Sequence, residues 1–190
     1  MKRIVILASG SGTNAENIIE YFNKTVEKNV VLVLSNKPEA GVLERARKHH
    51  VPTRVFNRSD LYESTRVQDW LEEARPSLVV LAGFLWLIPL NIIAKYRDRM
   101  VNIHPALLPK YGGKGMYGMH VHRAVLANNE TQSGITIHYV NEEYDAGDII
   151  FQATCPIAPG ETPESLASKV HELEYAHYPR VIDALLNGLE

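Results

Sequence analysis

Residues 3–12 read RIVILASGSG, a short apolar run that ends in a glycine-rich turn. Residues 3–8 are rich in β-branched side chains and two glycines follow closely, so the segment predicts a buried strand and a tight turn. Thr13 to Phe22 comes next, with apolar side chains at helical spacing. A buried strand, a glycine turn and an amphipathic helix in this order are typical of an α/β fold.

The alternation continues through the first half of the chain. Further buried strands are predicted at 30–34, 78–82 and 100–104, and a short strand is predicted at 53–56, with helices at 40–49 and 61–74. Strands that are apolar on both faces and alternate with helices indicate a parallel sheet covered on both sides.

The second half has a different pattern. Segments 134–140 and 148–153 alternate more and are joined by a short loop, which predicts an antiparallel pair, and Thr162-Pro163 begins a long C-terminal helix. We therefore expect an α/β fold with an open, mostly parallel twisted sheet, helices on both faces and an added antiparallel strand pair. We expect residues 1–190 to form one domain, with ligands at the carboxyl ends of the strands.

The composition narrows the classes of partner. The 190 residues include 22% charged side chains and have a formal net charge of −2, which argues against a disordered chain and against a general attraction to nucleic acid or anionic membranes. The longest apolar stretch, 78–90, is too short and interrupted to span a bilayer. Cys155 is the only cysteine, so no intrachain disulfide can form and a cytoplasmic location is expected. Small molecules are the expected partners.

The glycine turn fits the pattern G-x-G-x-x-A over residues 10–15. A dinucleotide site normally has an acidic residue after the second strand, but residues 35–37 are Ser-Asn-Lys. A Walker loop is excluded because no Gly-Lys-Ser/Thr follows. Two interpretations stay open: a phosphate held at the helix N-terminus by Gly12, Thr13 and Asn14, or a plain strand-to-helix turn.

The predicted strand at 100–104 ends in Asn102-Ile103-His104, and Pro105 follows it. Strand alternation places Asn102 and His104 on one face, at an edge of the sheet where this fold binds ligands. An amide and an imidazole together suit a reaction in which a carbonyl oxygen becomes an oxyanion. The alternative is a pair of polar side chains that only cap a loop.

An acidic loop over residues 141–148 joins the two antiparallel strands. Such a loop is usually a solvated turn. In the functional interpretation, one carboxylate reaches the imidazole, raises its pKa and keeps it protonated. The residues alone do not select which acid.

Other polar side chains give weaker signals. His120 and His122 could form a metal pair, but they diverge on a helix and no third ligand has the right spacing, so no metal is expected. His171, Glu174 and Tyr178 share a face of the last helix, which either faces solvent or lines a cleft. No role can be assigned to His138 from the pattern.

Five segments together resemble one enzyme family along essentially the whole chain. They are SGSGTN at 9–14, LAGF at 81–84, NIHPALLP at 102–109, GITIH at 134–138 and DAG at 145–147. The chain is similar to the phosphoribosylglycinamide formyltransferases of the formyltransferase superfamily. The resemblance implies transfer of a formyl group from 10-formyltetrahydrofolate, the co-substrate, to the amino group of N1-(5-phosphoribosyl)glycinamide in de novo purine (IMP) biosynthesis, by a monomer or homodimer without a metal.

The resemblance also implies roles for individual residues. Residues 1–100 form the phosphate-binding half, and residues 101–190 the catalytic and folate-binding half. In the catalytic group, Asn102 and His104 stabilise the oxyanion, and Asp145 keeps His104 protonated and relays the proton of the amine. The implied ligand contacts are Gly12, Thr13 and Asn14 for the phosphate, Pro105 and Glu174 for the ribonucleotide, and Phe84, Leu85, Trp86, Leu87, Ile88, Asn102 and Val140 for the folate.

The chain departs from the family pattern in two places. The stretch after Lys110-Tyr111 is longer and glycine-rich, and we hypothesise that residues 112–118 form a mobile lid. Trp86 stands where relatives frequently have a basic residue, and Arg58 is the nearest candidate for a family arginine.

Three alternatives remain. A 10-formyltetrahydrofolate hydrolase shares the Asn, His and Asp but has an N-terminal regulatory domain. A methionyl-tRNA formyltransferase needs a C-terminal RNA-binding domain. We expect neither, because the 190 residues are accounted for by the transferase pattern. The third alternative is a non-catalytic nucleotide-binding module.

Overall fold

The computed structural model describes residues 1–189 and places seven strands in one twisted sheet. The strand order is β3-β2-β1-β4-β5-β6-β7. The strands are β1 (Lys2–Ala8), β2 (Lys28–Ser35), β3 (Thr53–Val55), β4 (Leu78–Leu81), β5 (Met100–His104), β6 (Gln132–Tyr139) and β7 (Ile149–Pro156). The first five pair in parallel, and β6 and β7 pair antiparallel. This confirms the mostly parallel sheet with an added antiparallel pair.

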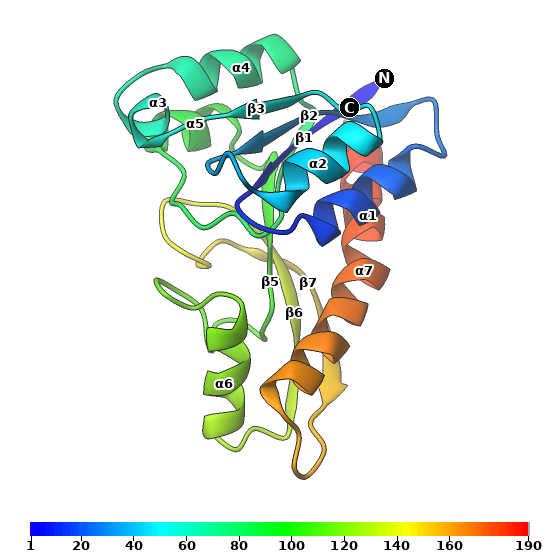
Figure 1. Cartoon of the computed structure of the whole chain (residues 1–190), viewed down its shortest axis with the longest axis vertical. Coiled ribbons are helices and arrows are strands. Elements are labelled where there is room, and N and C mark those ends of the chain that lie inside the picture. The colour runs from blue at the N-terminus through cyan, green and yellow to red at the C-terminus, as the bar shows by residue number, and fades with distance from the viewer. Residues whose placement is uncertain (190) are drawn as a thin grey trace.

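Helices cover both faces of this sheet (Figure 1). They are α1 (Thr13–Phe22), α2 (Gly41–Lys48), α3 (Arg58–Tyr62), α4 (Arg66–Ala74), α5 (Leu90–Lys95), α6 (Met119–Ala127) and α7 (Pro163–Gly188). Helices α1, α2, α6 and α7 pack on one face, and α3, α4 and α5 on the other. None of these helices is both long and apolar enough to cross a membrane.

The side chains of β1 alternate between the two faces of the sheet and so contribute to a separate core on each face. Ile4, Ile6 and Ala8 pack in the core beneath α1, α2 and α7, whereas Val5 and Leu7 pack in the core beneath α3 to α5. All five side chains are at most 1% exposed. An interior strand that is buried on both faces must be apolar throughout, as the sequence of residues 3–8 is.

The single helix predicted over residues 61–74 is wrong, because the structure divides this segment into α3 and α4. Helix α3 begins at a capping box in which Asn57 and Asp60 exchange hydrogen bonds. Helix α4 begins after Thr65, whose hydroxyl donates to Asp69 Oδ2 at 2.9 Å. Polar side chains that bond to nearby groups thus occur at both helix starts, and they interrupt an otherwise amphipathic pattern.

The C-terminal helix α7 begins as predicted. The Thr162 side chain accepts a hydrogen bond from the Ser165 N–H, and Pro163 occupies the first turn. In Figure 1 this helix runs along the long axis of the molecule, from the region of α6 to the two chain ends. It therefore extends from the end of the molecule near α6 to the end where the N- and C-termini lie (Figure 1).

Candidate active site

A cleft of about 750 Å³ opens at the carboxyl ends of β1, β4 and β5. This is the edge at which an open α/β sheet is expected to bind ligands. Its volume lies within the usual range for a small-molecule site. The lining comes from separate parts of the chain: residues 9–14, 37, 82–85, 102–105, 113–119, 122, 144, 145, 167, 171 and 174.

The glycine turn after β1 enters the cleft at the start of α1. Gly12 has φ +80°, and a Cβ there would lie 2.4 Å from the Cα and Cβ of Val42, so only glycine fits. The carbonyls of Gly10 and Ser11 accept hydrogen bonds from the Val42 N–H and Arg45 Nε of α2. The N–H groups of residues 13–15, at the start of α1, have no acceptor within the helix, and the structure gives them none elsewhere in residues 1–189. They can therefore bind an anion.

Glu174 of α7 faces this turn. It is only 4% exposed, and its Oε2 accepts hydrogen bonds from Asn14 Nδ2 at 2.9 Å and from His171 Nδ1 at 2.8 Å. The Glu174 contact raises the pKa of His171. Asn14 Oδ1 is buried and has no partner among the described residues. Of the polar row on α7, Glu174 and Tyr178 are buried and only His171 is exposed, so the row lines the cleft and core rather than facing solvent.

Asn102, His104 and Asp145 meet at the end of β5. Asn102 Nδ2 lies 3.3 Å from Asp145 Oδ1, and His104 Nδ1 lies 3.4 Å from Asp145 Oδ2. The two side chains of β5 therefore share one face, as strand alternation predicts. Their nitrogens converge on the same carboxylate, and a carbonyl oxygen placed there could accept from both.

Asp145 is held by the geometry of its loop. Its backbone is left-handed with φ +55°, and its Oδ2 accepts a hydrogen bond from the Gly113 N–H at 3.0 Å. A Cβ on Gly147 would lie 1.8 Å from the Tyr139 carbonyl oxygen, which explains glycine in the D-A-G segment. Although burial alone raises the pKa of Asp145, the nearby His138 side chain, the His104 imidazole and the Gly113 N–H bring it below its ordinary value. Asp145 is therefore ionised at neutral pH.

Burial dominates the electrostatics of His104, which is 3% exposed. It lowers the pKa of His104 below the ordinary value of 6.5 and outweighs Asp145 and the Tyr111 carbonyl, which both raise it. The net direction is opposite to the expected one, although the carboxylate itself acts as expected. The neutral form of the imidazole is therefore favoured at pH 7, and negative charge that develops beside the ring favours its protonation.

His138, to which the sequence assigned no role, belongs to this group. It pairs with Asn102 across β5 and β6, and its Nε2 lies 3.1 Å from Asn102 Nδ2. Its Nδ1 lies 2.8 Å from the Tyr139 carbonyl, which can only accept, so we assign the proton of the neutral ring to Nδ1. Nε2 then accepts from the amide of Asn102 and orients it.

The predicted folate segment 84–88 contributes unevenly to the cleft. Phe84 and Leu85 line it, whereas the Ile88 side chain is 3% exposed and packs in the core. Trp86 packs against Phe56 and Tyr62. The Leu87 main-chain carbonyl accepts a hydrogen bond from the Tyr62 hydroxyl. Val140 packs partly buried beside the same core and does not line the cleft.

Arg58 lies outside the cleft lining. Its guanidinium carbon lies 5.2 Å from the ring centroids of both Tyr62 and Trp86. The cation therefore stacks on the aromatic cluster beside the segment 84–88. Trp86, which replaces a basic residue of the family pattern, thus contacts a basic residue from α3.

Three further residues line the cleft. Pro105, a predicted contact, lies directly after β5, and Lys37, which the sequence pattern did not indicate, adds a positive charge near the glycine turn. His122 is 2% exposed, and its Nδ1 has no partner among the described residues. Burial lowers the pKa of His122. Its helix neighbour His120 is exposed, so the two rings diverge.

One group of side chains outside the cleft has metal-ligating atoms close together. Single atoms of Glu16, Glu20 and His49 lie within 4.8 Å of one another on α1 and after α2. Arg45 forms an ion pair with Glu16, and His49 lies 3.6 Å from Glu16 and 3.7 Å from Glu20. Ion pairs account for this cluster, which lies on the outer surface of two helices.

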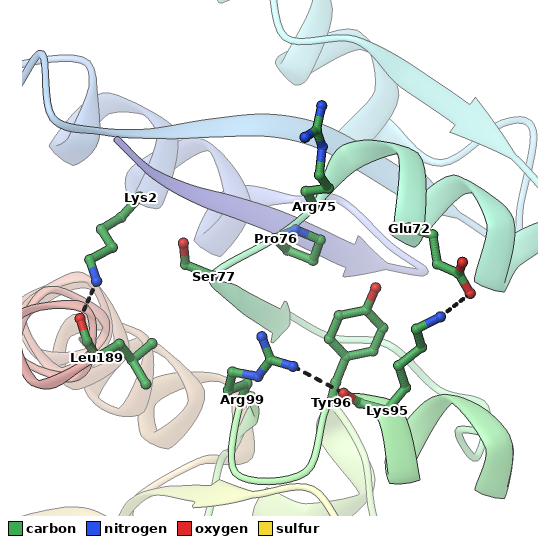
Figure 2. Close-up of a pocket in the computed structure, with 9 residues that line it drawn as sticks. All are labelled: Lys2, Glu72, Arg75, Pro76, Ser77, Lys95, Tyr96, Arg99 and Leu189. Carbon is green, nitrogen blue, oxygen red and sulfur yellow. Dashed lines mark hydrogen bonds and ion pairs between the residues drawn. The ribbon is translucent and has the colours of Figure 1, made fainter.

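A second hollow, of about 550 Å³, lies at the opposite edge of the sheet (Figure 2). Its cations bind groups at helix ends: Lys2 donates to the Leu189 carbonyl after α7, and Arg99 donates to the Lys95 carbonyl at the end of α5 at 3.1 Å. Lys95 forms an ion pair with Glu72. Helix C-termini favour cations and disfavour anions, so these charges stabilise the fold and do not form an anion site.

Comparisons with known proteins agree with this arrangement. Residues 2–182 match the family model described as formyl transferase. The chain is 40% identical over 190 residues to the chloroplastic phosphoribosylglycinamide formyltransferase of Arabidopsis thaliana, an alignment that covers 97% of this chain but only 65% of that relative. It is 35% identical to the phosphoribosylglycinamide formyltransferase of Escherichia coli, over 97% of this chain and 87% of the relative.

The fold is also similar to that of a solved structure from the same family. The phosphoribosylglycinamide formyltransferase of Bacillus halodurans superposes with a TM-score of 0.88 at 36% identity. The alignment covers 100% of this chain and 97% of that one. The likeness therefore includes the cleft and both halves of the sheet.

Proposed function

The chain belongs to the formyl transferase family, and on this basis we propose that it transfers the formyl group of 10-formyltetrahydrofolate to the amino group of N1-(5-phosphoribosyl)glycinamide in purine biosynthesis. One observation carries the proposal: a single cleft joins the open N-terminus of α1 to the group formed by Asn102, His104 and Asp145. A phosphorylated amine and a formyl donor can react in such a cleft because each has its own binding surface.

The ribonucleotide occupies the α1 side of the cleft. Its phosphate accepts hydrogen bonds from the N–H groups of Gly12, Thr13 and Asn14, and Lys37 adds a charge of the right sign. Its ribose lies beside Glu174 and Pro105. The unpartnered Asn14 Oδ1 supports this placement, because a sugar hydroxyl can donate to it.

The formyl folate occupies the other side of the cleft. Phe84 and Leu85 provide apolar surface for its ring system, with Trp86, Leu87, Ile88 and Val140 beside or behind them. The formyl carbonyl lies at Asn102. We assign no metal to this reaction, because the groups at the cleft suffice to stabilise the charge that develops.

The reaction proceeds by direct attack of the amine on the formyl carbon. One N–H of the Asn102 amide, which contacts Asp145 Oδ1 in the structure, donates instead to the oxygen as it becomes an oxyanion, and His104 donates from Nδ1 once it is protonated. The attacking amine loses one proton, which His104 can take up while the ionised Asp145 balances its charge. The bond between the formyl carbon and N10 of the folate then breaks, and N10 receives that proton. Holding both reactants in one cleft lowers the entropic cost.

A spectroscopic assay with 10-formyltetrahydrofolate tests the proposal. We expect deformylation of the folate that depends on glycinamide ribonucleotide, together with a formylated ribonucleotide product. Release of formate without an acceptor indicates a hydrolase instead, and unchanged activity after replacement of both Asn102 and His104 by alanine indicates another mechanism. The remaining parts of the proposal are a cytoplasmic, single-domain monomer or homodimer that acts on small molecules and not on nucleic acid.

A further inference from the structure

The loop after β5 contacts His104 on the side of the ring away from Asp145. The main-chain carbonyl of Tyr111 lies 2.7 Å from His104 Nε2. A carbonyl oxygen only accepts hydrogen bonds, so this contact assigns a proton to Nε2. In the neutral ring, Nδ1 then has the lone pair and lies on the side of Asp145, whose other oxygen contacts the Asn102 amide.

The Tyr111 carbonyl is held in this position by the side chain of its own residue. Tyr111 has φ +57°, a left-handed conformation that is unusual for a bulky residue. Its hydroxyl donates to Glu130 Oε1 at 2.8 Å, and Lys110 Nζ lies 2.8 Å from the same oxygen. Glu130 lies between α6 and β6, so the contact ties the β5 loop to a separate part of the chain. Such a strained backbone persists only where surrounding contacts determine it.

We propose that Tyr111 and Glu130 are positioning residues for formyl transfer: their hydrogen bond holds the Tyr111 carbonyl against His104 Nε2, which leaves Nδ1 as the ring nitrogen available to the reacting groups. The inference rests on the proposed function and extends it to two residues that touch neither substrate. The logic is that of other catalytic imidazoles, in which an acceptor on one nitrogen sets the tautomer and orientation of the other.

Several other groups act on His104, and the proposed contact is separable from them. Asp145 on the β6–β7 loop and Glu174 on α7 raise the pKa of His104, whereas His138 on β6 lowers it. His122 on α6 also lies within its electrostatic range. None of these four side chains hydrogen-bonds to Tyr111 or Glu130 in the described residues. Substitution of Tyr111 or Glu130 therefore changes the carbonyl contact and leaves the neighbouring charges in place.

The test is a double-mutant cycle of Tyr111→Phe, Glu130→Ala and the double variant. We expect kcat to fall roughly 5- to 10-fold in each, the loss of about one hydrogen bond, with the KM of both substrates within about twofold of wild type. The double variant should be no worse than Glu130→Ala, because Glu130→Ala already removes the Tyr111 contact together with that of Lys110. Glu130→Gln keeps an acceptor oxygen and should restore most of the activity. Tyr21→Phe removes a hydroxyl far from the cleft and should match wild type.

A second readout does not depend on turnover. Nitrogen-15 NMR of the imidazoles, with His104 assigned from His104→Asn, should show a proton on Nε2 in wild type and a mixture of tautomers in Tyr111→Phe. Unchanged kcat and tautomer in Tyr111→Phe, or additive losses in the double variant, overturn the proposal. If the wild-type protein does not transfer formyl groups, the proposed function is wrong. The NMR comparison of wild type and Tyr111→Phe still tests whether Tyr111 sets the tautomer of His104. If Glu130→Ala fails to fold, the Gln and Phe variants carry both readouts.

Discussion

His104 is the residue on which the proposed chemistry depends most. His104→Asn keeps a polar side chain but removes the ring nitrogen that faces Asp145. We expect kcat to fall by at least about 10²-fold, as for removal of an oxyanion donor, with little change in ribonucleotide affinity. Steady-state kinetics and ribonucleotide titration measure the two effects. His50→Asn is the matched control, because His50 is exposed and its φ of +57° suits asparagine.

Two buried histidines also link stability to pH. Burial lowers the pKa of His104 and His122 below 6.5, so as pH falls past 6.5 the unfolded chain binds protons that the folded chain does not. Above about pH 6.5, both histidines are neutral in either state and the free energy of unfolding has its full value. As the pH falls from 6.5 toward the folded-state pKa values, the free energy of unfolding decreases by up to ~1.4 kcal/mol per pH unit for each histidine. His171 acts in the opposite sense, because Glu174 raises its pKa.

Urea unfolding at pH 7 and pH 5.5 measures this linkage. We expect the free energy of unfolding to decrease between these values in wild type, and to decrease less in His122→Asn, which removes one titrating group. The absolute stability of the variant also falls, so the comparison is between slopes. His50→Asn should retain the wild-type slope. Equal slopes for His122→Asn and wild type contradict the assignment of a neutral, buried His122.

At the scale of elements, the turn between β1 and α1 requires glycine at one position. Gly12→Ala forces a Cβ into Val42 at φ +80°, and we expect a loss of roughly 2–4 kcal/mol of stability. The KM for the ribonucleotide should rise as well, because α1 must move. Chemical denaturation and kinetics measure these effects. Gly10→Ala is the control for stability, since a Cβ on Gly10 would have no atom within 4 Å and its φ is not positive.

The glycine-rich segment 112–118 is the element most suited to move. Gly113, Gly115 and Gly118 have positive φ, and no atom lies within 4 Å of a Cβ built on any of them. The segment also lines the cleft and donates to Asp145 through the Gly113 N–H. We predict that hydrogen exchange of residues 112–118 slows when both substrates bind. Equally slow exchange with and without the two ligands argues against a lid.

The sequence predicts the elements whose local signals agree with their burial. Residues 100–104 form a strand with the predicted bounds, because the apolar Met100, Val101 and Ile103 are buried and Pro105 follows the last residue. His138 was missed because its place beside Asn102 depends on the β5–β6 register, which no local pattern specifies. The Tyr111 carbonyl and Gly113 N–H were missed because main-chain groups have no residue-type signal. The roles of residues 84–88 as folate contacts stay a prediction.

At the scale of the whole molecule, the cleft joins the two ends of the chain. Asn14 and Glu174 are 160 positions apart, yet their side chains bond at 2.9 Å and connect α1 to α7. Helix α7 is also fixed elsewhere, because the buried Tyr178 hydroxyl donates to the Leu81 carbonyl of β4 at 2.8 Å. A ligand bound at Glu174 thus acts on contacts that hold the first helix, the last helix and the sheet together.

Ligand binding should therefore stabilise the whole chain. We expect Glu174 to determine the stabilisation by the ribonucleotide but not the stabilisation by the folate. At 100 times its dissociation constant, the ribonucleotide should add about 2.7 kcal/mol to the free energy of unfolding of the wild type. In Glu174→Gln, we expect most of this gain to disappear at the same concentration, whereas the gain from 10-formyltetrahydrofolate should persist. Thermal unfolding with each ligand measures both. Glu172→Gln, an exposed position on the same helix, should keep both gains. Equal loss of the two gains in Glu174→Gln would mean that this carboxylate supports the fold rather than the ribonucleotide.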